Sequence, residues 1–169
     1  MILMLEPVEG IRCEDLLARP AKSGSGSARG PCVTLPADNA QGGLPLAGLL
    51  DGDKLNVVGR GSADRISGDD PEELVERLSG LGLSREIQLK QIHLFADHSG
   101  DGGERSFAAR FDAALRARGL KVNEIKAPIG RVRCDTAGNI WILAGETWVP
   151  SSTALNYYAG PAVQDKHRG

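Results

Sequence analysis

Two short loops carry residue types that can do chemistry, and each follows an apolar run. They are Gly59-Arg60-Gly61-Ser62 and Asp97-His98-Ser99-Gly100. Asp97 and His98 supply a carboxylate and an imidazole, the groups used in general acid–base catalysis. Ser62 and Ser99 supply hydroxyls that a neighbouring base can activate. One interpretation is therefore a hydrolase that uses Asp97, His98 and one of the two serines.

Each of these residues also has a plainer interpretation. Neither serine lies in the Gly-x-Ser-x-Gly turn that presents an activated serine in α/β hydrolases. A loop aspartate such as Asp97 commonly accepts main-chain hydrogen bonds, and His98 at a strand end is often simply exposed. Arg60 is favoured as a pocket residue because Gly59 and Gly61 let the main chain turn tightly.

The sequence contains no pattern for a metal ion or a disulfide framework. Asp101 and Glu104 follow the second loop, but their spacing fits no known cation loop. The cysteines Cys13, Cys32 and Cys134 are far apart and odd in number. We therefore expect no metal site and no disulfides, and a reducing compartment is the simplest interpretation.

The elements that position the two loops follow from apolar patterning. Residues 55–58 and 92–96 are short apolar runs typical of buried strands, and residues 120–126 alternate as a third strand. Amphipathic helices are predicted between them, over 71–80 and 105–118. This alternation implies parallel strands with right-handed crossovers. Because ligands bind beyond the carboxyl ends of such strands, the two loops should open on the same rim.

The first of these helices has a clear start signal. Asp70 is a capping residue, and Pro71 suits the first helical position. Glu73 stands where it completes the reciprocal contact of a capping box. We therefore expect the helix to begin at Pro71.

The pattern changes toward both ends of the chain. Residues 131–133 and 139–143 flank a turn that contains Gly138, which predicts a β-hairpin. Residues 20–30 are rich in Gly and Ser and are interpreted as a linker. The predicted organisation is an N-terminal arm with its linker (1–30), an α/β domain (31–150) and a C-terminal tail (151–169).

Length and composition set the broad class. The chain has 169 residues, the size of one domain with one hydrophobic core. Only 4% of the residues are aromatic, so the core must consist mainly of Leu, Val, Ile and Ala. The formal net charge of -2 gives no strong field for nucleic acid or an anionic membrane. No apolar run approaches the roughly 18 residues of a membrane span, and residues 1–10 lack the pattern of a Sec signal peptide.

The two loops and their surroundings resemble a known family. Val57-Val58-Gly59-Arg60-Gly61 is similar to the hydrophobic–hydrophobic–Gly-His-Gly segment of caspase-like cysteine peptidases. Ile92-His93-Leu94-Phe95-Ala96-Asp97-His98-Ser99-Gly100 is similar to their strand–Ala-Cys-x-Ser-Gly segment. Ser106-Phe107-Ala108 and the hairpin residues Gly138-Asn139-Ile140-Trp141 follow in the same order. The resemblance is closest to the autoprocessing cysteine protease domains of large bacterial toxins, of the repeats-in-toxin and clostridial glucosylating types, over roughly residues 31–145.

This resemblance implies a fold and a degenerate active site. The expected fold is a caspase-like three-layer α/β sandwich with a mostly parallel central sheet and a C-terminal β-hairpin flap. In the family, a histidine after the first strand activates a cysteine after the second, and these places hold Arg60 and Asp97 here. Arginine cannot act as a base near neutral pH, and an aspartate is a poor acyl-transfer nucleophile. We expect no peptidase chemistry, and instead a charge-assisted pair between Arg60 and Asp97.

The implied function is that of a catalytically inactive binding or regulatory module in a bacterial toxin or effector system. Such a module would hold a protein or peptide at the two loops by strand addition, and the N-terminal arm is a candidate to occupy the cleft in cis. The resemblance implies the bacterial cytoplasm or delivery by a non-Sec route. The alternatives are the hydrolase described above and a structural piece of a larger assembly.

The resemblance also raises the question of an activating cofactor. Active members of the family are switched on by inositol hexakisphosphate, which binds basic residues around the hairpin. The candidates here are Lys121, Lys126, Arg131 and Arg133. Four cations are few for so highly charged a ligand, so we expect a solvated basic edge and no cofactor.

Overall fold

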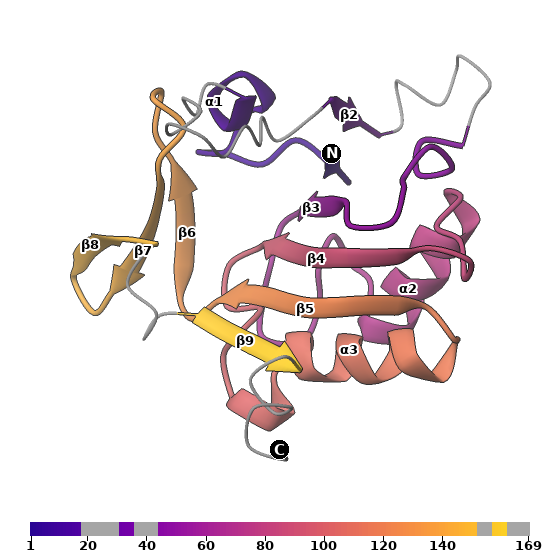
Figure 1. Cartoon of the computed structure of the whole chain (residues 1–169). Coiled ribbons are helices and arrows are strands. Elements are labelled where there is room, and N and C mark those ends of the chain that lie inside the picture. The colour runs from indigo at the N-terminus through magenta and orange to yellow at the C-terminus, as the bar shows by residue number, and fades with distance from the viewer. Residues whose placement is uncertain (18–30, 36–43, 152–156, 162–169) are drawn as a thin grey trace.

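The computed structural model of the chain describes residues 1–17, 31–35, 44–151 and 157–161 (Figure 1). Its centre is a six-stranded sheet with the order β2-β1-β3-β4-β5-β9. Five strands are parallel: β1 (Ile2–Met4), β2 (Cys32–Thr34), β3 (Lys54–Val58), β4 (Gln88–Phe95) and β5 (Lys121–Pro128). The sixth strand, β9 (Tyr157–Pro161), runs antiparallel to β5. The predicted mostly parallel α/β sheet is thus confirmed.

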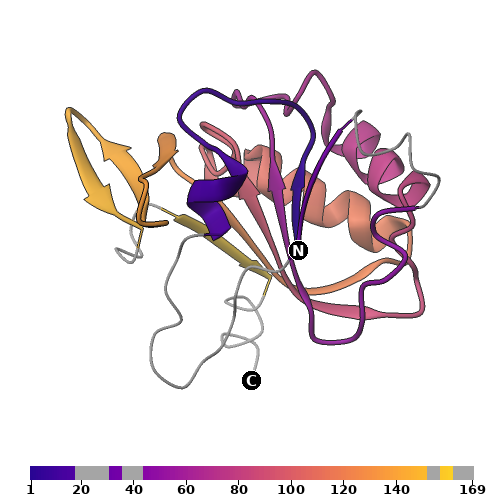
Figure 2. The ribbon, with the colours of Figure 1, turned by 90° about the horizontal axis from the view of Figure 1, so that it is seen from above.

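Different elements cover the two faces of this sheet. Helices α2 (Pro71–Gly80) and α3 (Phe107–Ala117) lie side by side on one face, and the short helix α1 (Cys13–Leu17) lies on the other (Figure 2). A second, antiparallel sheet of β6 (Arg131–Cys134), β7 (Ile140–Ala144) and β8 (Thr147–Pro150) stands beyond the carboxyl ends of the parallel strands (Figure 1). The predicted β-hairpin is therefore present, and β8 extends it to three strands.

Strand β1 shows why the sheet has a core on each side. Leu3 packs into the larger core with α2 and α3, whereas Ile2 and Met4 pack into the smaller core with α1 and the antiparallel sheet. Successive side chains of a strand point to opposite faces, so a run that is apolar throughout suits a strand buried on both sides. The opening residues are therefore an inner strand, hydrogen-bonded between β2 and β3.

The helices begin where local chemistry places them. The predicted capping box of α2 is confirmed, because Asp70 Oδ1 accepts from Glu73 N at 2.8 Å and Glu73 Oε1 accepts from Asp70 N at 3.3 Å. Helix α3 begins at Phe107 after the N-cap Ser106, whose Oγ accepts from Ala109 N at 3.0 Å. These caps fix the crossover helices on the sheet.

The structure also holds a disulfide, which shows that the expectation of none was wrong. Cys13 at the start of α1 is bonded to Cys32 at the start of β2, with 6.1 Å between their Cα atoms. The residues are 19 positions apart. They meet because β2 pairs with β1 at one edge of the sheet, and α1 folds back near this edge (Figure 1). Within the described ranges, no helix is long and apolar enough to cross a membrane.

Candidate functional site

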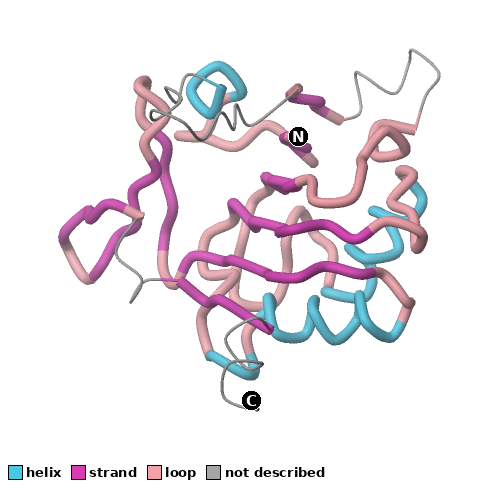
Figure 3. Tube along the Cα trace, viewed as in Figure 1, coloured by secondary structure: helices cyan, strands magenta, loops and turns pink. Residues whose placement is uncertain are grey.

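The candidate site is the rim formed by the loops at the carboxyl ends of the parallel strands. Loops that follow β1, β3, β4 and β5 gather at this end of the sheet, next to β6 (Figure 3). Val58 and Phe95 are neighbours in the register of β3 and β4, so the two predicted loops start side by side. A Cβ added to Gly61 would collide with the main chain of Asp97. This close approach confirms that the two loops share one rim.

Asp97 ties the loop after β4 to the antiparallel sheet. Its Oδ1 accepts from the main-chain N–H of Val132 at 2.8 Å and from Arg133 Nη1 at 3.2 Å, and its Oδ2 lies 3.4 Å from the same Nη1. Arg131 Nε lies 3.9 Å from Oδ2. The side chain is only 25% exposed. The plainer interpretation, a loop aspartate that accepts a main-chain hydrogen bond, is confirmed.

Arg60 forms a different pair from the one expected. Its main-chain N–H donates to Glu6 Oε1 at 3.2 Å, and its Nε lies 3.8 Å from the same oxygen. The side chain is 77% exposed and makes no ion pair with Asp97. The expected Arg60–Asp97 pair is therefore wrong. Because β1 is an inner strand next to β3, Glu6 lies beside Arg60. Asp97 pairs instead with Arg131 and Arg133 of β6.

His98 is held in the left-handed region and is hydrogen-bonded to Asp101. Its φ is 62°, unusual for a residue with a side chain. Its Nδ1 lies 2.8 Å from Asp101 Oδ2. Asp101 Oδ1 accepts from Gly130 N at 2.7 Å, and His98 N donates to Gly130 O at 2.6 Å. The loop is thus bonded to the turn between β5 and β6, and the imidazole is oriented by a carboxylate.

The two candidate serines do not join this histidine. Ser99 is fully buried, and its Oγ donates to Ala96 O at 2.8 Å. Ser62 is exposed, and its Oγ accepts the main-chain N–H of Asp64 at 3.3 Å and of Arg65 at 3.1 Å. Both hydroxyls serve local turns. Among the described residues, no serine–histidine pair forms at the rim.

The remaining glycines of the two loops allow close main-chain approaches. A Cβ on Gly100 would press against the carbonyls of Ala127 and Pro128, and Gly100 N donates to Pro128 O at 2.8 Å. Gly59 is buried, and a Cβ there would collide with the side chains of Ile66 and Ser67. These glycines shape the rim and supply no chemistry.

The four basic residues considered for an inositol phosphate do not gather in one place. Lys121 begins β5 at the amino end, and Arg131 begins β6 beyond its carboxyl end. The length of β5 separates Lys121 from Arg131 by about 23 Å, at the usual rise per residue of a β-strand. Arg131 and Arg133 face Asp97, whereas Lys126 lies within β5 beside His93. Within the described ranges, no group of three or more His, Cys, Asp or Glu side chains is arranged to hold a metal ion.

A segment of the predicted N-terminal arm, residues 5–12, lies at the rim, and we call it the rim loop. Gly10 O accepts from Cys134 N at 3.1 Å, and Gly10 lies so close to Arg133 that a Cβ would collide with the arginine side chain. At the other end of the loop, Leu5 N donates to Val58 O at 2.8 Å. The sequence carries a signal for this loop, because an apolar run followed by Glu6-Pro7 is typical of a strand that ends in a loop.

A hollow of about 380 Å³ lies beside β6. It is lined by Arg133, Cys134, Asp135, Trp141 and Trp148. Trp141 Nε1 donates to Asp135 Oδ2 at 2.9 Å, and this bond, with main-chain donors from Asn139 and Ala137, holds the pKa of Asp135 below its ordinary value. The anionic carboxylate therefore fixes the orientation of one indole in the wall.

Comparison with models of known protein families gives no match, and comparison with curated proteins gives none either. The class of this protein is therefore described by its fold alone. The chain contains a mostly parallel α/β sheet with helices on its faces and an antiparallel three-stranded sheet beside the carboxyl ends of its strands.

Proposed function

We propose that the chain is a non-catalytic binding module, similar in architecture to cysteine-protease-like domains, that holds an extended peptide along the outer edge of β6. One observation carries this proposal: the N–H groups of Val132 and Cys134 donate to acceptors outside the antiparallel sheet. The first donates to the Asp97 carboxylate and the second to the Gly10 carbonyl.

The strand geometry explains why this edge suits a peptide. In an antiparallel pair, alternate residues direct their main-chain groups toward the partner strand and away from it. Val132 and Cys134 are two residues apart, so both N–H groups point away from β7. The Gly10 carbonyl already occupies the position that a carbonyl of an added strand would take. Strand addition uses main-chain hydrogen bonds for affinity and side-chain hollows for specificity.

The same geometry argues against peptidase or hydrolase chemistry. Asp97 uses both carboxylate oxygens to hold the hairpin, and Arg60 contacts Glu6. His98 is oriented by Asp101, yet a general base needs a nucleophile within hydrogen-bond reach. Ser99 is buried and engaged with Ala96. The rim therefore supports binding better than acyl transfer.

The biological setting is proposed from the sequence resemblance. We place the module in a bacterial toxin or effector system, delivered by a route that bypasses Sec. A disulfide between Cys13 and Cys32 is compatible with passage through an oxidising compartment on such a route.

A labelled peptide tests the binding proposal. The probe is the fluorescein-labelled peptide LEPVEGIR, the sequence of the rim loop. In the variant Gly10→Ala, an alanine is strained at the φ of 79° that this position adopts, and its Cβ meets the Arg133 side chain, so the internal loop should release the edge. We expect fluorescence polarisation to show binding at least tenfold tighter than to the wild type. Amide shifts in ¹H–¹⁵N spectra should centre on Cys134.

Gly48→Ala is the matched control, because a Cβ there meets no described atom within 4 Å. It should bind the peptide as the wild type does. Absence of binding to Gly10→Ala would contradict the proposal. So would cleavage of a quenched peptide library by the wild type that is lost in His98→Ala, since that result would favour the hydrolase.

A further inference from the structure

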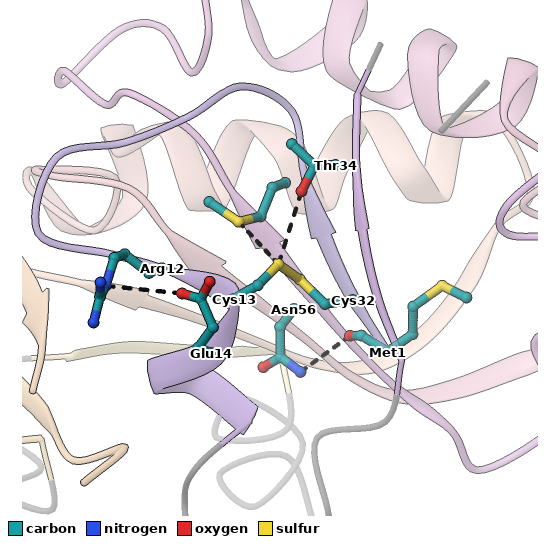
Figure 4. The surroundings of a disulfide bond; sticks show 8 residues. Met1, Arg12, Cys13, Glu14, Cys32, Thr34 and Asn56 are labelled. Carbon is teal, nitrogen blue, oxygen red and sulfur yellow. Dashed lines mark hydrogen bonds and ion pairs between the residues drawn. A yellow bond between two sulfur atoms is a disulfide. The ribbon is translucent and has the colours of Figure 1, made fainter. Parts of the chain in front are cut away.

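The rim loop is fixed at both ends by strong constraints. Its first end continues from β1, an inner strand of the sheet. Its second end enters α1, where Cys13 is covalently bonded to Cys32 of β2 (Figure 4). Cys13 Sγ also lies 3.3 Å from Met4 Sδ and 3.8 Å from Thr34 Oγ1. The disulfide thus holds the loop on the same face of the sheet that packs against β6.

Between the described residues, the other polar contacts that hold this loop are exposed or single hydrogen bonds. Glu6 contacts Arg60 at an exposed position, and such pairs contribute little to stability in water. Gly10 makes one hydrogen bond to β6. Ile11 and Leu16 are buried, but Leu16 lies on a helix of only five residues. A helix of that length does not persist without tertiary support, so α1 depends on the packing of Leu16 in the smaller core and on the covalent link together.

We propose that the Cys13–Cys32 disulfide is a redox latch that keeps the rim loop on the edge of β6, and that its reduction frees this edge for a peptide. The latch rests on the peptide-binding function proposed above and adds its regulation. In the oxidised chain, the Gly10 carbonyl accepts the Cys134 N–H and so competes with a peptide carbonyl for this donor. In the reduced chain, α1 and the rim loop detach together, and this competitor leaves.

The chemistry is thiol–disulfide exchange with a dithiol reductant. One thiolate of the reductant attacks a sulfur of the pair, which breaks the Cys13–Cys32 bond and forms a mixed disulfide. The second thiolate of the reductant displaces the protein sulfur, so the reductant leaves as a disulfide. The protein gains two electrons and two protons as two thiols. Cys13 and Cys32 are both partly exposed, so a small dithiol can reach them.

Hydrogen exchange of the Cys134 amide tests the latch without a peptide. We expect exchange to accelerate at least tenfold when the full chain is treated with dithiothreitol. Cys13→Ser should show the fast rate without the reductant. Cys134→Ser should respond to the reductant as the wild type does, at the amide of residue 134, because its disulfide is intact. Equal rates in the oxidised and reduced wild type would overturn the latch, and so would global unfolding on reduction.

Binding of the labelled LEPVEGIR peptide separates the latch from the function on which it rests. The latch predicts at least tenfold tighter binding to the reduced wild type and to Cys13→Ser, with no further effect of dithiothreitol on Cys13→Ser. Tight binding to Gly10→Ala together with equal binding to the oxidised and reduced wild type would overturn the latch and leave the peptide site standing. No binding to any form would overturn both.

Discussion

The carboxylate of Asp97 accepts the main-chain N–H of Val132 at 2.8 Å, and this hydrogen bond joins the loop after β4 to the first strand of the antiparallel sheet. The two residues are 35 positions apart. Arg133 strengthens the contact from the same strand. A position that resembles the place of a peptidase nucleophile therefore has a structural task here, because it sets where β6 lies relative to the parallel sheet.

Replacing Asp97 should accordingly lower stability. Asp97→Ala leaves the Val132 N–H without its acceptor and Arg133 without its carboxylate, and we expect a loss of about 1–3 kcal/mol in the free energy of unfolding. Asp97→Asn keeps one oxygen acceptor and should lose less. Urea unfolding measures both. Asp64→Ala is the control, since that carboxylate is 85% exposed and should stay within about 0.5 kcal/mol of the wild type.

Much of the fold was predictable because its signals are local. The capping box at Asp70 and Glu73, the apolar face of α3 and the glycine turn of the hairpin each lie within a few residues of chain. The strand at 92–96 was predicted too short, since β4 begins at Gln88. Alternation of strands and helices then gave parallel pairing through a general topological rule.

The features that were missed depend on contacts between distant segments. Nothing near Cys13 in the sequence indicates Cys32 as its partner, because only the pairing of β1 with β2 brings them together. The antiparallel strand β9 was missed for the same reason, since it becomes a strand by pairing with β5. At the rim, Arg60 was predicted to pair with Asp97, but it contacts Glu6 instead. Glu6 lies beside Arg60 because the N-terminal residues form an inner strand.

Gly61→Ala should disturb the rim more than its size suggests. The added Cβ would collide with main-chain atoms of Ala96 and Asp97, which cannot rotate away as a flexible side chain can. We expect a loss of about 1–3 kcal/mol, the usual cost of overpacking. Gly48→Ala should be close to neutral in the same thermal or urea unfolding experiment. Equal stability of the two variants would show that the two loops do not press on each other.

The turn at Asp135 should make stability depend on pH. Hydrogen bonds from Trp141 Nε1, Asn139 and Ala137 lower the pKa of this carboxylate in the folded chain from its ordinary value of 3.8. A lowered folded-state pKa gives stability that is present above the unfolded value and is lost as pH falls through the folded value. Asp135→Asn should therefore be less stable than the wild type at neutral pH.

The difference between these two proteins should shrink as pH falls below 3.8, because the wild-type carboxylate then takes up its proton. Urea unfolding at a series of pH values, followed by tryptophan fluorescence, measures this difference. Trp141 reports on the turn directly, since its Nε1 donates to Asp135. A gap that stays constant across the acidic range would show that the hydrogen bonds at Asp135 do not favour its ionised form.

His98 allows backbone strain and hydrogen bonding to be separated. At φ 62° any side chain is strained relative to glycine, while the imidazole gains a 2.8 Å contact with Asp101. His98→Ala keeps the strain and loses the contact, whereas His98→Gly loses both. We expect His98→Gly to be more stable than His98→Ala by about 1 kcal/mol in urea unfolding. If His98→Ala proves as stable as His98→Gly, the loop has another conformation open to it, and the strain at the rim is not maintained by the bonds to Gly130.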